Sequence, residues 1–91
     1  MSIKADHPHL SIRALQIILP MCSDYFVSST RGYWRFILPN GSVAIGYAGG
    51  GKWEASVVDE RDPHLWDDDY YCTYHDVSEK DVAELCLKVA G

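Results

Sequence analysis

Two apolar runs that flank Asn40-Gly41 constrain the fold of this chain more than any other feature of its sequence. The runs cover residues 33–38 and 42–47, and both are rich in β-branched and aromatic side chains. A type I′ turn needs a positive φ at both central residues, which Asn and Gly tolerate best. The sequence therefore predicts a β-hairpin with Asn40-Gly41 at its turn. Alternation predicts two faces for the first strand, Trp34, Phe36 and Leu38 on one and Tyr33, Arg35 and Ile37 on the other.

Other β-prone runs predict further strands on both sides of this hairpin. Residues 25–29 and 70–75 are rich in aromatic and β-branched side chains, and residues 52–58 alternate. Residues 48–51, which are mostly glycine, predict a flexible connection into the last of these alternating runs.

A helix is predicted near each end of the chain. Leu10, Ala14, Ile17 and Met21 recur at helical spacing after Asp6, a candidate N-cap, and Pro20 should end or kink this helix. The apolar stripe is widened by Ile12, Leu15, Ile18 and Leu19. Ser78 and Asp81 predict a capping box at the start of a second helix, whose apolar stripe is Val82, Leu85, Cys86 and Val89. The expected fold is α+β over a single domain, residues 1–91. An N-terminal helix and a C-terminal helix cover one face of an antiparallel sheet of three to five strands, built on the central hairpin.

The net charge of −5 is distributed unevenly along the chain. Residues 1–53 carry five basic and two acidic side chains, whereas residues 54–91 carry three basic and eleven acidic ones. A concentration of like charge attracts oppositely charged surfaces and speeds encounter with them. The second part of the chain is therefore a candidate docking surface for a basic partner. The alternative is that these carboxylates only keep a small protein in solution.

An acidic and aromatic segment in this second part supplies the predicted contact residues. Aromatic side chains flanked by charge are typical of the anchors of protein interfaces. A run of carboxylates can also imitate a row of phosphates in an Arg/Lys-rich site. The predicted partner-binding residues are Asp59, Glu60, Asp62, Trp66, Asp67, Asp68, Asp69 and Tyr70.

Metal binding and catalysis are weaker interpretations of the sequence. The histidines and Cys72 lack the paired Cys-x-x-Cys spacing of zinc modules, and the aspartates lack the pattern of a calcium loop. No metal or other cofactor is expected. Cys72 with His75 could form a nucleophile and base, but a cysteine in a tyrosine-rich strand is more often packed than reactive. We expect no enzyme, and a small Cys/His-dependent enzyme is kept as the second alternative.

A nucleic-acid-binding module is the first alternative. Basic and aromatic residues, among them Arg31, Tyr33, Arg35 and Lys52, suit phosphate contacts and stacking on unpaired bases. The order of helix, strands and helix also resembles a double-stranded-RNA-binding domain in outline. The basic run that such domains carry at the start of their last helix is replaced here by Asp76, Glu79, Lys80 and Asp81. That replacement and the net negative charge argue against direct binding of nucleic acid.

Three cysteines without framework spacing, and an N-terminus without the pattern of a signal peptide, predict a cytoplasmic protein. The longest apolar stretch, residues 17–22, is too short to cross a bilayer, so no membrane partner is expected. The preferred function is that of a non-enzymatic protein that binds and blocks a basic surface of a larger protein, with a homodimer left open. In size, acidity and lack of motifs the chain is similar to small phage-encoded inhibitors of host defence, such as anti-CRISPR proteins. That resemblance implies a viral protein that occupies a nucleic-acid-binding groove.

Overall fold

A computed structural model of the chain describes residues 10–28, 32–61 and 72–91. The elements follow in the order α2 (Ile12–Ile18), η1 (Leu19–Met21), β1 (Asp24–Ser28), β2 (Tyr33–Leu38), β3 (Gly41–Gly49), β4 (Lys52–Asp59), β5 (Cys72–Val77) and α3 (Glu79–Ala90). The strands form one antiparallel sheet in the order β1-β2-β3-β4-β5. The predicted α+β fold, with a helix before and a helix after an antiparallel sheet, is confirmed.

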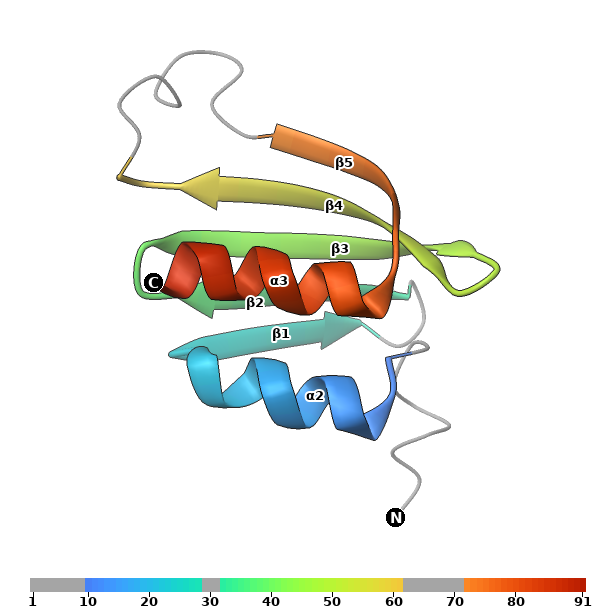
Figure 1. Cartoon of the computed structure of the whole chain (residues 1–91), viewed down its shortest axis with the longest axis horizontal. Coiled ribbons are helices and arrows are strands. Elements are labelled where there is room, and N and C mark those ends of the chain that lie inside the picture. Colours follow the sequence, from blue (N-terminus) through green and yellow to red (C-terminus); the bar gives the residue numbers. More distant parts are fainter. Residues whose placement is uncertain (1–9, 29–31, 62–71) are drawn as a thin grey trace.

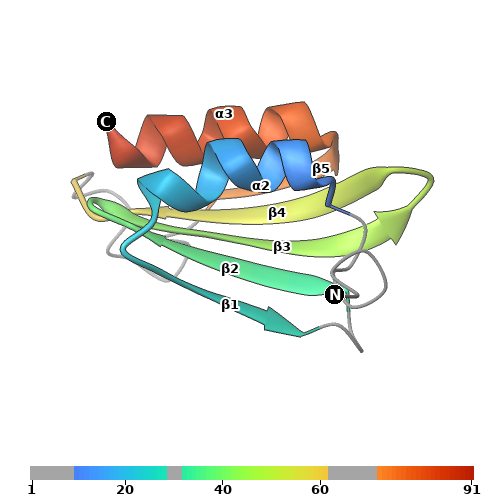
Figure 2. The same ribbon diagram turned by 90° about the horizontal axis from the view of Figure 1, so that it is seen from below.

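The two described helices, α2 and α3, lie on the same face of the sheet, and neither lies over the opposite face (Figures 1 and 2). In that layer α3 runs across the middle of the sheet and α2 lies on the β1 side of α3 (Figure 1). Alternation along β2 buries Trp34, Phe36 and Leu38 beneath the helices, as predicted, and β4 does the same with Trp53, Ala55 and Val57.

The core combines this covered sheet face with one stripe from each helix. Trp34 stacks on Phe36 with ring centroids 5.5 Å apart, and Tyr47 meets Trp53 edge to face at 5.0 Å. The buried residues, which form one continuous cluster, are Leu10, Ala14, Leu15, Ile18, Trp34, Phe36, Leu38, Val43, Ile45, Trp53, Ala55, Val57, Val77, Val82, Cys86 and Val89.

The turn between β2 and β3 is not the predicted one. Leu38 pairs with Gly41, so the connecting residues are Pro39 and Asn40. Asp76 is the only non-glycine residue in the described ranges with a positive φ, so Asn40 lacks the conformation that a type I′ turn requires. A turn centred on Asn40-Gly41 would pair Pro39 with Ser42, and proline has no N–H to contribute to that pair.

Two consecutive positive φ angles occur instead between β3 and β4. Gly50 and Gly51 have φ values of 62° and 73°, and they form a tight turn where the sequence predicted a flexible connection. The amide of Gly51 donates a hydrogen bond to Tyr47 Oη at 2.8 Å. Glycine meets the conformational demand of this turn without steric cost.

The helix ends follow local capping chemistry. Ser78 and Asp81 form the predicted capping box of α3, and Gly91 is its C-cap. The N-cap of α2 is Ser11, whose Oγ accepts a hydrogen bond from the Ala14 amide at 3.1 Å. The predicted cap Asp6 lies outside the described residues.

The apolar stripe of the first helix is narrower than predicted. Ala14, Leu15 and Ile18 are buried, as predicted, while Ile12 and Ile17 are each 54% exposed. The helix passes into the 3-10 turn η1 at Leu19, next to Pro20, as the sequence predicted.

Candidate functional site

Two of the eight predicted contact residues, Asp59 and Glu60, lie in the described part of the structure, at the end of β4. Asp62, Trp66, Asp67, Asp68, Asp69 and Tyr70 lie outside the described residues. The structure therefore describes the segments on either side of residues 62–71. One flank is at Asp59, and the other runs from β5 into α3.

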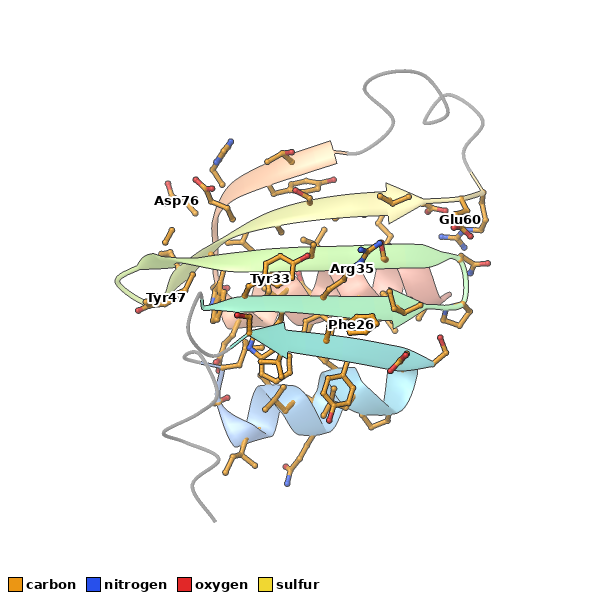
Figure 3. All side chains as sticks on the ribbon, turned by 180° about the vertical axis from the view of Figure 1, so that it is seen from behind. Phe26, Tyr33, Arg35, Tyr47, Glu60 and Asp76 are labelled. Atoms are coloured by element: carbon orange, nitrogen blue, oxygen red, sulfur yellow. The ribbon has the colours of Figure 1, made fainter. Side chains whose placement is uncertain are left out.

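The Asp59 carboxylate is held by Arg61. Arg61 Nε donates to Asp59 Oδ1 at 2.9 Å, and one terminal nitrogen donates to Oδ2 at 2.8 Å. That terminal nitrogen also donates to the carbonyl oxygen of Lys88 at 2.9 Å, which ties this end of β4 to the end of α3. The hydrogen bond from Arg61 lowers the pKa of Asp59 to about 2. Asp59 is therefore charged but already engaged within the chain, whereas the Glu60 side chain points outward at the sheet end (Figure 3).

The second flank begins with a bulge in β5. Tyr74 pairs with Ala55 and Val77 with Trp53, so His75 and Asp76 together oppose the single residue Glu54. Asp76 has φ = 56°, in the left-handed region that aspartate tolerates better than most side chains. A bulge at a sheet edge bends the strand and changes the direction of its side chains.

This bulge borders an open cleft of about 360 Å³ between β5 and α3. Its lining carries three carboxylates against one lysine and one histidine, together with apolar side chains at its floor: Tyr74, His75, Asp76, Val77, Asp81, Glu84, Leu85 and Lys88. The hydrogen bond from the Ser78 amide to Asp81 lowers the pKa of that carboxyl. The cleft is therefore an acidic depression that can accept a positively charged side chain.

The two flanks lie at opposite ends of the sheet. Glu60 follows the last residue of β4, whereas Asp76 lies beside the start of β4, and Figure 3 shows them at opposite ends of that strand. The length of β4 separates them. The structure brings together Asp76, Asp81 and Glu84 but does not place Asp59 beside them. Glu84 was missed as a contact residue, although its spacing of three from Asp81 puts both on one side of a helix.

The uncovered sheet face carries a second group of side chains. Phe26 pairs with Arg35 across β1 and β2, and Ser28 pairs with Tyr33, so Phe26, Arg35 and Tyr33 share this face (Figure 3). The neighbouring positions on β3 are the small residues Ala44 and Gly46. Of the other residues considered for nucleic acid, Arg31 lies outside the described residues. Lys52 lies near Asp81 and contributes to lowering its pKa.

Metal and nucleophile chemistry find little support in the described ranges. No three His, Cys, Asp or Glu side chains among the described residues cluster closely enough to hold a metal ion. His75 Nδ1 lies 3.3 Å from Glu54 Oε2, and both side chains are well exposed. Burial raises the pKa of Cys22 to about 11 and that of Cys86 to about 12. The Cys72 side chain lies outside the described part of the structure.

Comparison of the chain with models of protein families, with curated proteins and with solved structures gives no match. Within the described ranges, no helix has both the length and the apolar character needed to cross a membrane.

Proposed function

We propose that this protein acts without catalysis, by docking its acidic side onto a basic surface of a larger protein and so blocking that surface. The observation that carries the proposal is the cleft between β5 and α3, which Asp76, Asp81 and Glu84 line. The proposal locates the protein in the cytoplasm, because its three cysteines lack the spacing of a disulfide framework. The partner is a protein that presents clustered arginine or lysine, including one whose groove binds nucleic acid.

The charge of the cleft supports this function in two ways. The hydrogen bond from the Ser78 amide lowers the pKa of Asp81, so its charge persists at more acidic pH than that of an ordinary aspartate. Tyr74, Val77 and Leu85 supply apolar surface beside the carboxylates, which suits the long methylene stem of an inserted arginine or lysine. Charge-assisted hydrogen bonds between such a guanidinium and a carboxylate are stronger than neutral ones.

The acidic segment 62–69 belongs to the same proposal. Asp67, Asp68 and Asp69 precede β5 in the chain and would add further carboxylates to the docking surface. Electrostatic attraction would then guide the encounter, and Trp66 and Tyr70 would act as aromatic anchors.

Affinity capture from host lysate, with nuclease treatment, tests this proposal. We expect capture of a basic protein that is sensitive to salt and insensitive to nuclease. The double variant Asp76→Asn/Glu84→Gln and the triple change of Asp67, Asp68 and Asp69 to lysine should each weaken the capture strongly. Asparagine is chosen at position 76 because it tolerates the left-handed backbone found there.

The matched control is Asp24→Asn, which is compared with the single cleft variant Glu84→Gln. Each changes the net charge by the same amount, but Asp24 points to the uncovered sheet face, where it pairs with Ile37. Equal capture by the wild type, the cleft variant and the triple variant would remove the proposal. If the control variant weakens capture as much as the cleft variant does, the loss reflects net charge and not the cleft.

A second candidate function is binding of single-stranded nucleic acid on the uncovered face. The observation that favours it is the shared position of Phe26, Tyr33 and Arg35 on the face that neither α2 nor α3 covers (Figure 3). Aromatic side chains on an open sheet stack on unpaired bases, and arginine contacts phosphate. A gel-shift assay with labelled single-stranded oligonucleotides at low salt tests it. Binding that is lost in Tyr33→Ala and in Arg35→Gln supports it, and no shift with the wild type excludes it.

A further inference from the structure

We infer that β1 is the interface of a homodimer, in which the β1 strands of two copies pair antiparallel about Phe26 and join their sheets. This inference is independent of the proposed function. It starts from the strand order, which places β1 at one edge of the sheet and β5 at the other. An edge strand exposes backbone N–H and C=O groups that can pair with another chain.

The two edges differ in how they are protected. β5 is interrupted by the bulge at His75 and Asp76 and exposes an imidazole and a carboxylate there. β1 pairs with β2 through all five of its residues without a register shift. The segment Asp24–Ser28 contains no lysine, arginine or proline. Bulges, charges and prolines are the usual means of blocking edge-to-edge pairing, and β1 has one charged residue at its first position.

Apolar exposure is concentrated on the same side of the molecule. Tyr25 is 44% exposed, Phe26 56% and Val27 41%, and these are three consecutive positions of the strand. Ile12 and Ile17 of α2, in the helix layer on this side, are each 54% exposed. These are five of the eight large hydrophobic side chains that are exposed among the described residues. Exposed apolar side chains gathered on one side of a protein are typical of interaction sites.

Hydrogen bonding in β1 identifies the backbone groups available to a partner strand. The Tyr25 amide donates to the carboxylate of its neighbour Asp24 at 2.8 Å, so this amide points away from β2. Because backbone groups alternate in direction along a strand, the N–H and C=O groups of Val27 point outward as well. Tyr25 and Val27 are thus the positions that can form a hydrogen-bonded pair with a second copy.

The sequence of β1 is complementary to itself in this arrangement. A two-fold axis at Phe26 places Tyr25 opposite Val27 of the second copy, and four backbone hydrogen bonds form across the axis. Phe26 faces Phe26 on the uncovered side of the sheet, in the closer type of pair. Asp24 faces Ser28, which avoids opposing like charges and lets the Ser28 hydroxyl replace the Tyr25 amide as a donor to that carboxylate. This match is the reason for assigning a second copy, and not another protein, as the occupant.

The test is the mass in solution, measured by sedimentation equilibrium from micromolar to near-millimolar concentrations. We expect the wild type to reach twice the mass of the chain. Phe26→Lys places two lysines opposite each other across the axis, so association should weaken about 100-fold or more. Val27→Pro removes an outward N–H without touching the β1–β2 ladder, and edge positions of that kind tolerate proline. It should also give a monomer, while the control Val27→Thr keeps the N–H and the dimer.

Circular dichroism and thermal unfolding show whether each variant is folded. If Val27→Pro does not fold, Phe26→Lys decides the question, because the side chain of Phe26 is more than half exposed. A wild type that stays monomeric over the whole range overturns the inference. A dimer that persists in folded Phe26→Lys overturns it equally.

Discussion

The carboxylate of Glu79 accepts two hydrogen bonds from Ser11, one from the backbone amide at 3.2 Å and one from the hydroxyl at 2.9 Å. Ser11 is the N-cap of α2, and Glu79 is the first residue of α3. Ser11 Oγ also accepts the hydrogen bond from Ala14 that caps α2. The Glu79 side chain therefore connects the beginnings of both helices, which are 68 positions apart in the sequence.

We predict that Glu79→Ala lowers the free energy of unfolding by about 1 kcal/mol, because two hydrogen bonds to a partly exposed carboxylate are lost. Ser11→Ala should cost about 1 kcal/mol through the cap. Urea unfolding of both single variants and the double variant gives the coupling between the two residues, which should be about 0.5 kcal/mol or more. The control Glu84→Ala, on the exposed side of α3, should change stability by less than about 0.5 kcal/mol. If the losses in the two single variants simply add up in the double variant, the hydrogen bonds between Ser11 and Glu79 do not stabilise the fold.

Gly41 and Gly46 of β3 offer a matched pair of substitutions. A Cβ at Gly41 would overlap the carbonyl oxygen of Val58 in β4, whereas a Cβ at Gly46 would meet nothing within 4 Å. Backbone atoms of a central strand cannot move aside cheaply, so Gly41→Ala should destabilise the fold by about 2 kcal/mol. Gly46→Ala should leave stability unchanged or raise it by up to about 1 kcal/mol, since glycine is unfavourable inside a strand. Thermal unfolding checks both, and similar losses at the two positions would refute this account of Gly41.

Gly41 also belongs to the turn whose position could not be predicted from local sequence signals. Alternation identified the buried faces of β2 and β4, and the capping box identified the start of α3, because these signals depend only on neighbouring residues. The position of the first turn was wrong, because the missing N–H of Pro39 outweighed the preference of Asn40-Gly41 for positive φ. That error moved the register by an even number of residues, so the predicted faces were unaffected.

The candidate site was harder to predict for a different reason. Asp76 reaches the cleft through a bulge that depends on how β5 pairs with β4, and strand pairing is not encoded in any local pattern. Glu84 joins Asp76 only because α3 folds back beside β5. The acidic composition of residues 54–91 was visible in the sequence, but the separation of Asp59 from Asp76, Asp81 and Glu84 in the fold was not.

The ion pair of Asp59 and Arg61 predicts a specific dependence of stability on pH. Arg61 lowers the pKa of Asp59 from 3.8 to about 2, so the folded state binds this proton less tightly than the unfolded state. The stabilisation is therefore complete above pH 3.8 and is lost as the pH falls toward 2. Arg61→Gln removes it, so the difference in urea midpoint between wild type and variant should be largest near neutral pH and shrink in acid. A difference that stays constant over this range would contradict the assignment.

Buried thiols give the last prediction, which also bears on the alternative of a cysteine-dependent enzyme. Burial raises the pKa of Cys86 from 9.0 to about 12 and that of Cys22 to about 11, and the Cys22 thiol donates to the Ile18 carbonyl at 3.3 Å. Because the thiolate is the reactive form, iodoacetamide at mildly alkaline pH should modify Cys86 at least about 100-fold more slowly than free cysteine. Peptide mapping measures the rates at the three cysteines, and unfolding in urea should equalise them.

The raised pKa of Cys86 also predicts that the folded protein becomes less stable in alkali. Above pH 9.0 the unfolded chain loses the Cys86 proton while the folded chain keeps it, so the free energy of unfolding falls as the pH rises toward 12. Cys86→Ala should be less stable at neutral pH, because it leaves a small cavity in the core, but its alkaline decline should be shallower. Rapid modification of Cys86 in the folded protein would contradict its burial. A rate at Cys72 well above that of free cysteine would instead support the Cys72–His75 enzyme over the binding function proposed above.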